Sequence, residues 1–197
     1  MKVRNHMSPD PVTVGPQATV DQALNLMRQH GIRHLPVLDE GRLVGLVTDN
    51  ELRSAWFPSL LAEVQVKDLM SPAPQTVPAE ATIYQAARML HIGRITGLVV
   101  LDEGRVAGII TLTDVLGVLV EILGLLSETT RLDVRLRPEP GMLDQVHAII
   151  SRHGGRVISL ALVSSHGDQW VYSFRLQKME MVPLLAELRA AGLEVLE

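Results

Sequence analysis

Apolar positions recur along the chain at two spacings, one typical of helices and one of strands. After Thr19 they fall at i, i+3, i+4 and i+7, which is one face of a helix. The helix should begin at the capping box Thr19-x-x-Gln22 and end at Gly31. Apolar runs over 35–38 and 43–47 flank turn residues and predict a tight hairpin.

The same pattern occurs twice. When the chain is shifted by 63 residues, Val3–Leu52 aligns with Val66–Val115 without a gap, and 21 of the 50 positions are identical. Each copy ends in a further helix start, Thr48-x-x-Glu51 in the first and Thr111-x-x-Asp114 in the second. A unit of ~50 residues cannot easily bury its own apolar faces, so the two copies should pack on each other.

A different pattern begins near Arg131 and predicts a separate domain. Leu132, Val134 and Leu136 alternate with polar residues, as in a half-buried strand. The elements that follow are helix 142–153, strands 157–163 and 170–176 around a turn at 164–169, helix 182–191 and strand 193–196. This βαββαβ order is ferredoxin-like. A helix over 116–128 should join the parts, which gives an α/β (α+β) chain with domains 1–63, 64–126 and 127–197.

Composition excludes several classes of protein. The chain is 47% apolar and 20% charged, as in a soluble globular protein, and contains no cysteine for disulfides, thiolate metal sites or a nucleophile. A net charge of −4 and only six aromatic residues weigh against nucleic acid as a partner. The longest apolar stretch, 115–126, is shorter than the ~20 residues needed to span a membrane, and no signal peptide is visible. The cytoplasm is the expected location.

The two copies resemble a tandem pair of CBS domains. The motifs are Met-Ser-Pro before the first strand, the stretch Gly31–Val37, and Gly-h-h-Thr-x-x-acid at Gly45–Glu51 and Gly108–Asp114. The tail resembles an ACT domain in its βαββαβ order and in Pro140-Gly141-Met142-Leu143 before the first helix. The acidic residue usual three places before the glycine is replaced by Pro138. This CBS–CBS–ACT layout resembles the AcuB-like family, whose name implies a link to acetoin utilisation.

The two Thr-x-x-acid motifs have two interpretations. As capping boxes they only satisfy the helix start. As a ligand site, the free N–H groups and the Thr hydroxyl would hold phosphate, while the carboxylate accepts hydrogen bonds from ribose hydroxyls. The resemblance implies that a CBS pair binds an adenosyl nucleotide, such as AMP, ADP, ATP or S-adenosylmethionine, as a regulatory ligand. The candidate nucleotide-binding residues are Thr13, Ile32, Arg33, His34, Pro36, Thr48, Glu51, Thr76, Ile95, Thr96, Thr111, Thr113 and Asp114.

The copies differ where Arg33 and His34 of the first align with Thr96 and Gly97 of the second, so their two sites should differ in ligand or affinity. Arg33 would pair with phosphate in bidentate fashion, or else be an ordinary exposed residue. His30 and His34 are interrupted by Gly31 and do not predict a metal site. No catalytic motif is present, and no obligatory cofactor is expected.

These observations predict a ligand-sensing regulatory protein and not an enzyme. The ACT part would bind an amino acid or another small metabolite, or mediate dimerisation, and a homodimer is expected. Its candidate ligand or interface residues are Pro140, Gly141, Met142, Leu143, Val157 and Ile158. The helical apolar stripe Leu116–Leu126 should pack in the core or in a dimer. One alternative is an interaction module without ligand that regulates a partner enzyme by contact alone, and another is an enzyme with an unrecognised active site.

Overall fold

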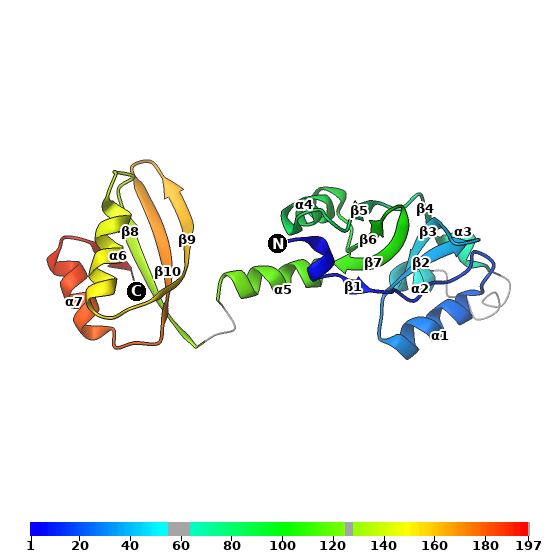
Figure 1. Cartoon of the computed structure of the whole chain (residues 1–197), viewed down its shortest axis with the longest axis horizontal. Coiled ribbons are helices and arrows are strands. Elements are labelled where there is room, and N and C mark those ends of the chain that lie inside the picture. Colours follow the sequence, from blue (N-terminus) through cyan, green and yellow to red (C-terminus); the bar gives the residue numbers. More distant parts are fainter. Residues whose placement is uncertain (55–63, 125–127, 197) are drawn as a thin grey trace. The chain divides into compact units, whose positions relative to one another are not determined.

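The computed structural model describes residues 1–54, 64–124 and 128–196 and divides into two compact units (Figure 1). The first unit is Met1–Leu116 and the second is Gly117–Glu197. The division falls inside helix α5 (Leu112–Ile122). The domain limits expected at 63/64 and 126/127 remain predictions.

The first unit contains the duplicated elements, in the same order in each copy. The first copy consists of η1 (Val3–Asn5), β1 (Ser8–Pro9), α1 (Val20–His30), β2 (His34–Asp39), β3 (Arg42–Thr48) and α2 (Asp49–Ser54). The second consists of α3 (Val66–Leu69), β4 (Ser71–Pro72), β5 (Thr76–Pro78), α4 (Ile83–Gly93), β6 (Gly97–Asp102), β7 (Arg105–Thr111) and α5. The hairpin and helix predictions are confirmed in both copies.

The predicted helix ends are also found. Thr19 accepts a hydrogen bond from the Gln22 backbone N–H, and the Gln22 side chain accepts from the Thr19 N–H, which completes the capping box. Gly31 ends α1 in the left-handed conformation with φ of 64°. Its counterpart Arg94 adopts the same conformation at the end of α4, with φ of 49°. The fold therefore keeps the left-handed ending even where the second copy lacks glycine.

The two copies exchange their first short strands. β1, from the first copy, pairs antiparallel with β7 of the second, so that Pro9 lies opposite Gly108. β4, from the second copy, pairs with β3 of the first, so that Pro72 lies opposite Gly45. The resulting sheets have the orders β1-β7-β6-β5 and β2-β3-β4. Each sheet thus needs a strand from the other copy, which ties the repeats into one unit.

The second unit is a four-stranded antiparallel sheet with two helices on one face (Figure 1). Its sheet order is β11-β8-β10-β9, and the βαββαβ order predicted from the pattern is confirmed. The elements are β8 (Thr129–Leu136), α6 (Met142–Arg152), β9 (Val157–His166), β10 (Gln169–Gln177), α7 (Val182–Ala190) and β11 (Glu194–Leu196). Leu132, Val134, Phe174 and Leu176 of the sheet are buried against the helices.

Two sequence predictions about element ends are wrong. β9 was expected to end at Val163, but it runs to His166 and leaves only Gly167 and Asp168 as the turn. Polar residues at its end hid the strand, because an edge strand can carry polar side chains facing water. The helix expected over 116–128 continues the helix that Thr111-x-x-Asp114 predicted: α5 begins at Leu112, as that motif indicates, but it ends at Ile122, before Gly124 with φ of 66°. Residues 125–127 of that prediction lie outside the described residues.

The apolar stripe on α5 is not in the core. Val115 and Val118 are buried, whereas Leu116, Leu119 and Ile122 have exposed fractions of 57%, 45% and 50%. The core-packing interpretation of the stripe is therefore wrong for the described residues, and the dimer interpretation stays a prediction. No helix in the described ranges 1–54, 64–124 and 128–196 is long and apolar enough to cross a bilayer.

Candidate functional site

The start of α5 holds Thr111 and Asp114 in a closed hydrogen-bonded box. One carboxylate oxygen of Asp114, Oδ2, accepts from the Thr111 backbone N–H and from its hydroxyl, both at 2.7 Å. The Asp114 N–H donates to Thr111 Oγ1 at 3.3 Å. The second carboxylate oxygen, Oδ1, makes no hydrogen bond to any described residue. It is therefore free to accept from a ligand.

The start of α2 repeats this box but uses both carboxylate oxygens. Glu51 Oε2 accepts from the Thr48 N–H at 2.7 Å and from the Thr48 hydroxyl at 2.8 Å. Glu51 Oε1 also accepts from the Ser71 hydroxyl at 2.9 Å. Ser8 is the counterpart of Ser71 in the repeat, yet its hydroxyl bonds to no described residue. The aspartate is one methylene shorter than Glu51, so the second helix start lacks this extra bond.

Two loops lie directly against these helix starts. The Asp49 N–H donates to the Arg33 carbonyl oxygen at 3.0 Å, and the Leu112 N–H donates to the Thr96 carbonyl oxygen at 3.0 Å. Each copy thus brings its loop before β2 or β6 to its own Thr-x-x-acid motif. Arg33 is exposed, and its guanidinium has no ion pair within the described chain. It is available to an anionic group.

His34 joins the two copies at the middle of this region. Its Nε2 lies 2.9 Å from Thr96 Oγ1, a hydrogen bond between the two loops. A Cβ atom at Gly97 would lie 2.9 Å from His34 Cδ2 and Nε2. The glycine is therefore needed to make room for the imidazole. Since Gly97 is the repeat counterpart of His34, the two copies differ here because only one ring fits between them.

Burial lowers the pKa of His34 below its usual value of 6.5, and the positive charge of Arg33 adds to this. The negative charges of Glu51 and Asp114 raise the pKa of His34, but the net pKa is still below its usual value. The folded chain thus favours the neutral ring. A histidine whose pKa is lowered by folding favours the folded state at pH values above the pKa it has in the unfolded chain. As the pH falls below about 6.5, the unfolded chain takes up the proton more readily than the folded one, and the free energy of unfolding decreases.

We expect His34→Gln to reduce the loss of stability on acidification. Between about pH 7.5 and pH 5.5 the wild-type free energy of unfolding should fall more steeply than that of the variant, because only the wild type must protonate a partly buried ring. Urea unfolding at several pH values measures both slopes. Equal slopes in the two proteins would show that His34 does not contribute.

The other predicted nucleotide-binding residues lie outside the two Thr-x-x-acid boxes and the His34–Thr96 contact. Ile32 and Ile95 are half-buried residues just before the loops. Thr13 precedes Val14, which bridges in parallel to Val37 beside Pro36, and Thr76 lies opposite Val99 in the matching place of the second copy. Thr113 is exposed in the first turn of α5. Sequence reasoning missed Ser71 and Gly97, since only the folded contact shows what each one meets.

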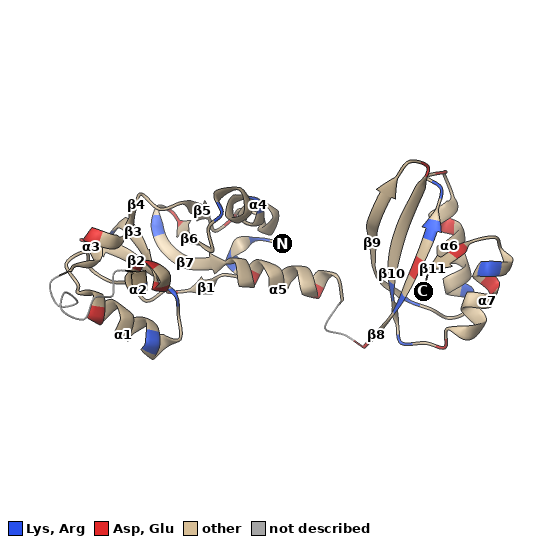
Figure 2. Cartoon of the chain, turned by 180° about the vertical axis from the view of Figure 1, so that it is seen from behind, with Lys and Arg blue, Asp and Glu red and all other residues tan. Residues whose placement is uncertain are grey.

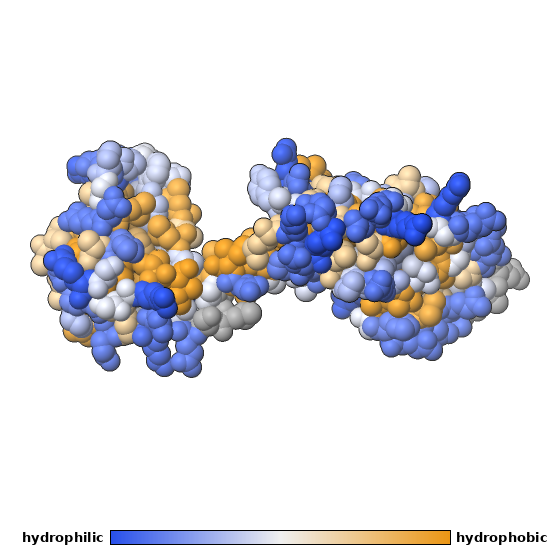
Figure 3. Space-filling view, in the orientation of Figure 1, coloured by the Kyte–Doolittle hydropathy of each residue, from blue (hydrophilic) through white to orange (hydrophobic). Residues whose placement is uncertain are grey.

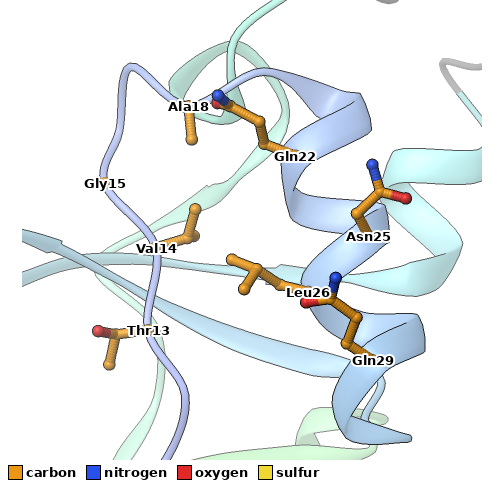
Figure 4. A pocket seen from close by; sticks show the side chains of 8 residues that line it. All are labelled: Thr13, Val14, Gly15, Ala18, Gln22, Asn25, Leu26 and Gln29. Atoms are coloured by element: carbon orange, nitrogen blue, oxygen red, sulfur yellow. The ribbon is translucent and has the colours of Figure 1, made fainter.

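Two cavities lie elsewhere on the first unit. One of about 450 Å³ lies between the Thr13–Gly15 segment and the polar face of α1, which contributes Gln22, Asn25 and Gln29 (Figure 4). The other, of about 520 Å³, lies between the two hairpin turns and includes Thr76, Arg42 and Arg105. Neither is lined by Thr111 or Asp114.

The predicted residues of the second unit form two groups. Gly141, with φ of 87°, precedes α6, and Met142 and Leu143 pack against the core behind the exposed Pro140. Val157 also packs against the core, whereas Ile158 beside it is 44% exposed. In the described part of the chain no three His, Asp or Glu side chains lie close enough to hold a metal ion.

The CBS family model, described as "CBS domain", matches the chain over residues 3–57 and 66–121, which are the two copies. This chain belongs to the CBS-domain family. A CBS domain-containing protein of Dictyostelium discoideum is 31% identical over 134 residues, which cover 61% of this chain and 92% of that protein. Inosine-5′-monophosphate dehydrogenase of Korarchaeum cryptofilum is 40% identical over 54% of this chain, but the match spans only 22% of the enzyme. The comparisons thus place the CBS pair with regulatory modules and not with the enzymes, as the sequence predicted.

Solved CBS structures share this fold. CBSX2 in complex with AMP has a TM-score of 0.54 at 32% identity and covers 61% of this chain and 97% of its own. The CBS pair of MJ0100 in complex with 5′-methylthioadenosine and S-adenosyl-L-methionine has a TM-score of 0.55 at 26% identity, with 60% and 95% covered. A Vibrio cholerae protein assigned to acetoin utilization (AcuB) has a TM-score of 0.56 at 29% identity, with 66% and 98% covered. CBS pairs similar to this one therefore bind AMP or S-adenosylmethionine-type ligands.

Proposed function

We propose that this chain is a regulatory protein whose CBS pair binds an adenosyl nucleotide at the start of α5. The observation that carries the proposal is the free Oδ1 of Asp114, held beside the Thr111 hydroxyl at a helix start. Similar CBS pairs bound to AMP and to S-adenosyl-L-methionine support the ligand class. The nucleotide is a regulatory ligand and not an obligatory cofactor.

Each residue has a chemical role in this proposal. Asp114 accepts hydrogen bonds from the ribose hydroxyls through Oδ1, while Oδ2 remains bonded to Thr111. The Thr111 hydroxyl donates its proton to Oδ2 and so orients the carboxylate. The N–H groups of the first turn of α5 that this box and the Thr96 carbonyl oxygen leave free hold a phosphate or another polar group of the ligand. Arg33, which is exposed and precedes His34 in the chain, supplies a positive charge for an anionic group of the ligand. The Thr48–Glu51 start is the weaker site, because Ser71 already occupies its second oxygen.

The second unit completes the proposed regulator as an ACT-like domain. Its βαββαβ order, with Gly141 before the first helix, supports this assignment. It binds a small metabolite such as an amino acid near Pro140–Leu143, or it joins two chains into a homodimer. The similarity to the Vibrio cholerae AcuB protein supports a role in acetoin utilisation. The cytoplasm is the proposed location.

A second function is an interaction module that controls a partner enzyme by contact alone. The observation in its favour is that both Thr-x-x-acid boxes are already satisfied as helix caps. The exposed apolar side chains of α5 would then contact the partner. This module would need no nucleotide.

Calorimetric titration of the full chain with AMP, ATP and S-adenosylmethionine separates the two functions. We expect at least one of these to bind and to raise the melting temperature, since a ligand that binds only the folded state stabilises it by RT ln(1 + [L]/Kd). Guanosine monophosphate is the control for an adenine-specific site. The absence of heat and of any shift in melting with all three ligands would favour the interaction module.

A further inference from the structure

A cavity of about 520 Å³ lies between the two hairpin turns of the first unit. Its wall contains one arginine from each copy, Arg42 at the turn between β2 and β3 and Arg105 at the turn between β6 and β7. Apolar side chains, among them Leu43 and Leu101, form much of the rest. Figure 3 shows strongly hydrophilic side chains beside apolar ones on the face of the first unit where β3, β4 and β6 lie. Sites for small molecules usually combine an apolar wall with a few polar groups, in a volume of roughly 300–1,000 Å³.

Neither of these two guanidinium groups is neutralised within the described chain. Arg42 and Arg105 are exposed, and neither forms an ion pair or a side-chain hydrogen bond with a described residue. Both turns also carry carboxylates (Figure 2), but no acidic residue among those described lines the cavity, and Asp102 lies 3.4 Å from the guanidinium of Arg4. Two positive charges on one cavity wall repel each other, so an anion between them is favourable. A guanidinium binds a carboxylate or a phosphate through two parallel hydrogen bonds.

The repeat gives a second reason to expect an anion in this cavity. Ala73, on the cavity wall, is the counterpart of Asp10 in the first copy, and both residues have a left-handed backbone, with φ of 50° and 46°. Aspartate and asparagine tolerate that conformation better than alanine does. The second copy therefore departs from the locally favoured residue at the position where a carboxylate would line the cavity beside the two arginines. A carboxylate there would compete with an anionic ligand.

We propose that this cavity is a second ligand site, which binds a small organic dianion with an apolar middle. Each guanidinium holds one of the two anionic groups, either a carboxylate or a phosphate, while Leu43 and Leu101 contact the carbon chain between them. Because Arg42 and Arg105 come from different copies, the bound dianion joins the two copies at their hairpin turns. Among the described residues, none of α5 lines this cavity, so the site is separate from the one proposed for the nucleotide.

Three small anions with the same carbon chain test this site by calorimetric titration of the full chain. Glutarate carries two carboxylates, propane-1,3-bisphosphonate carries two phosphonates in place of phosphates, and butyrate is the matched control with a single carboxylate. We expect at least one of the two dianions to bind saturably, one per chain, and about tenfold or more tighter than butyrate, because only a dianion engages both arginines. Whichever dianion binds more tightly supports the site and identifies the anionic group that it prefers.

Substitutions on the cavity wall test which residues hold the dianion. Arg42→Gln and Arg105→Gln should each weaken its binding by about tenfold, since each removes one charged pair. Ala73→Asp should weaken it by a similar factor, because it places a carboxylate beside the arginines. Ala73→Asn is the matched control, with nearly the same shape and no charge, and should bind within about threefold of wild type. The left-handed backbone at this position accepts both residues, so neither should lower the melting temperature.

Several results would overturn the proposal. Both dianions binding no more tightly than butyrate would show that the arginines do not act together. Wild-type affinity in Arg42→Gln or in Arg105→Gln, or equal affinities in Ala73→Asp and Ala73→Asn, would show that the dianion binds elsewhere. Titration of the two arginine variants with AMP, ATP and S-adenosylmethionine should match the wild type, so a failure of this site is distinct from a failure of the nucleotide site.

Discussion

Asp114→Ala should weaken binding of the adenosyl ligand by about 10- to 100-fold, which is the largest functional effect we expect. A hydrogen bond to a charged group contributes roughly 1.5–3 kcal/mol, and 1.4 kcal/mol corresponds to a factor of ten in affinity. The substitution removes Oδ1, the oxygen that no described residue uses. Calorimetric titration of the variant with the ligand that binds the wild type measures the change.

Two other variants show whether the effect comes from the ligand contact. Asp114→Asn keeps an oxygen that can accept and should bind better than Asp114→Ala. Glu51→Ala removes the same kind of helix cap at α2, where Ser71 already occupies the second oxygen. It should lose about 1 kcal/mol of stability, as Asp114→Ala also should, but should affect ligand affinity much less.

The titrations must be run well below the melting temperature of each variant, so that loss of a cap is not read as loss of binding. Wild-type affinity in Asp114→Ala would mean that the box serves only as a helix cap. Equal losses in the two alanine variants would mean that both helix starts bind ligand, contrary to the difference in their hydrogen bonds.

Gly108→Ala should destabilise the first unit by about 2–3 kcal/mol, at the upper end of the range for overpacking. A Cβ atom at Gly108 would lie 2.8 Å from the backbone oxygen of Ser8 and 2.5 Å from Met7 Sδ. The backbone of β1 cannot move away without breaking its pairing with β7. Urea unfolding monitored by circular dichroism gives the change in free energy.

Gly45→Ala is the matched control, because the repeat places it in the same strand position. A Cβ there would lie 2.3 Å from Met70 Sδ, and its three nearest neighbours are all atoms of the Met70 side chain, which can rotate away. Alanine also lowers the entropy of the unfolded chain and so offsets part of the cost, by roughly 0.4–1 kcal/mol. We therefore expect a loss below about 1 kcal/mol at Gly45. A larger loss at Gly45 than at Gly108 would contradict the role given to the Ser8 backbone.

Local pattern was enough to predict most elements of this chain. The capping box at Thr19, the hairpin turns and the βαββαβ order each depend on residues within one or two turns of each other. Such short-range rules apply wherever the motif occurs. The predictions failed at the C-terminal ends of β9 and α5, where neighbouring segments and exposure, rather than local residue type, decide where an element stops.

The candidate site could be predicted only in part. The Thr-x-x-acid motifs and the loop at Arg33 were found because the resemblance and the repeat point to them. That Glu51 is bonded to Ser71 while Asp114 keeps a free oxygen depends on side-chain reach between distant segments. The contact of His34 with Thr96 and Gly97 joins the two copies across 62 residues of chain. No pattern within one copy carries that information.

By itself, the sequence determined the duplication, which segments are helices or strands, and the family, because these depend on residue spacing and identity. Only the tertiary structure decided that each copy contributes the short strand of its Met-Ser-Pro motif to the other's sheet, where β1 pairs with β7 and β4 pairs with β3. It also decided which of two nearly identical helix starts keeps a free carboxylate oxygen. The physical reason is the same in each case. Long-range pairing and packing determine these outcomes, and a difference of one methylene matters only once the partner is in place.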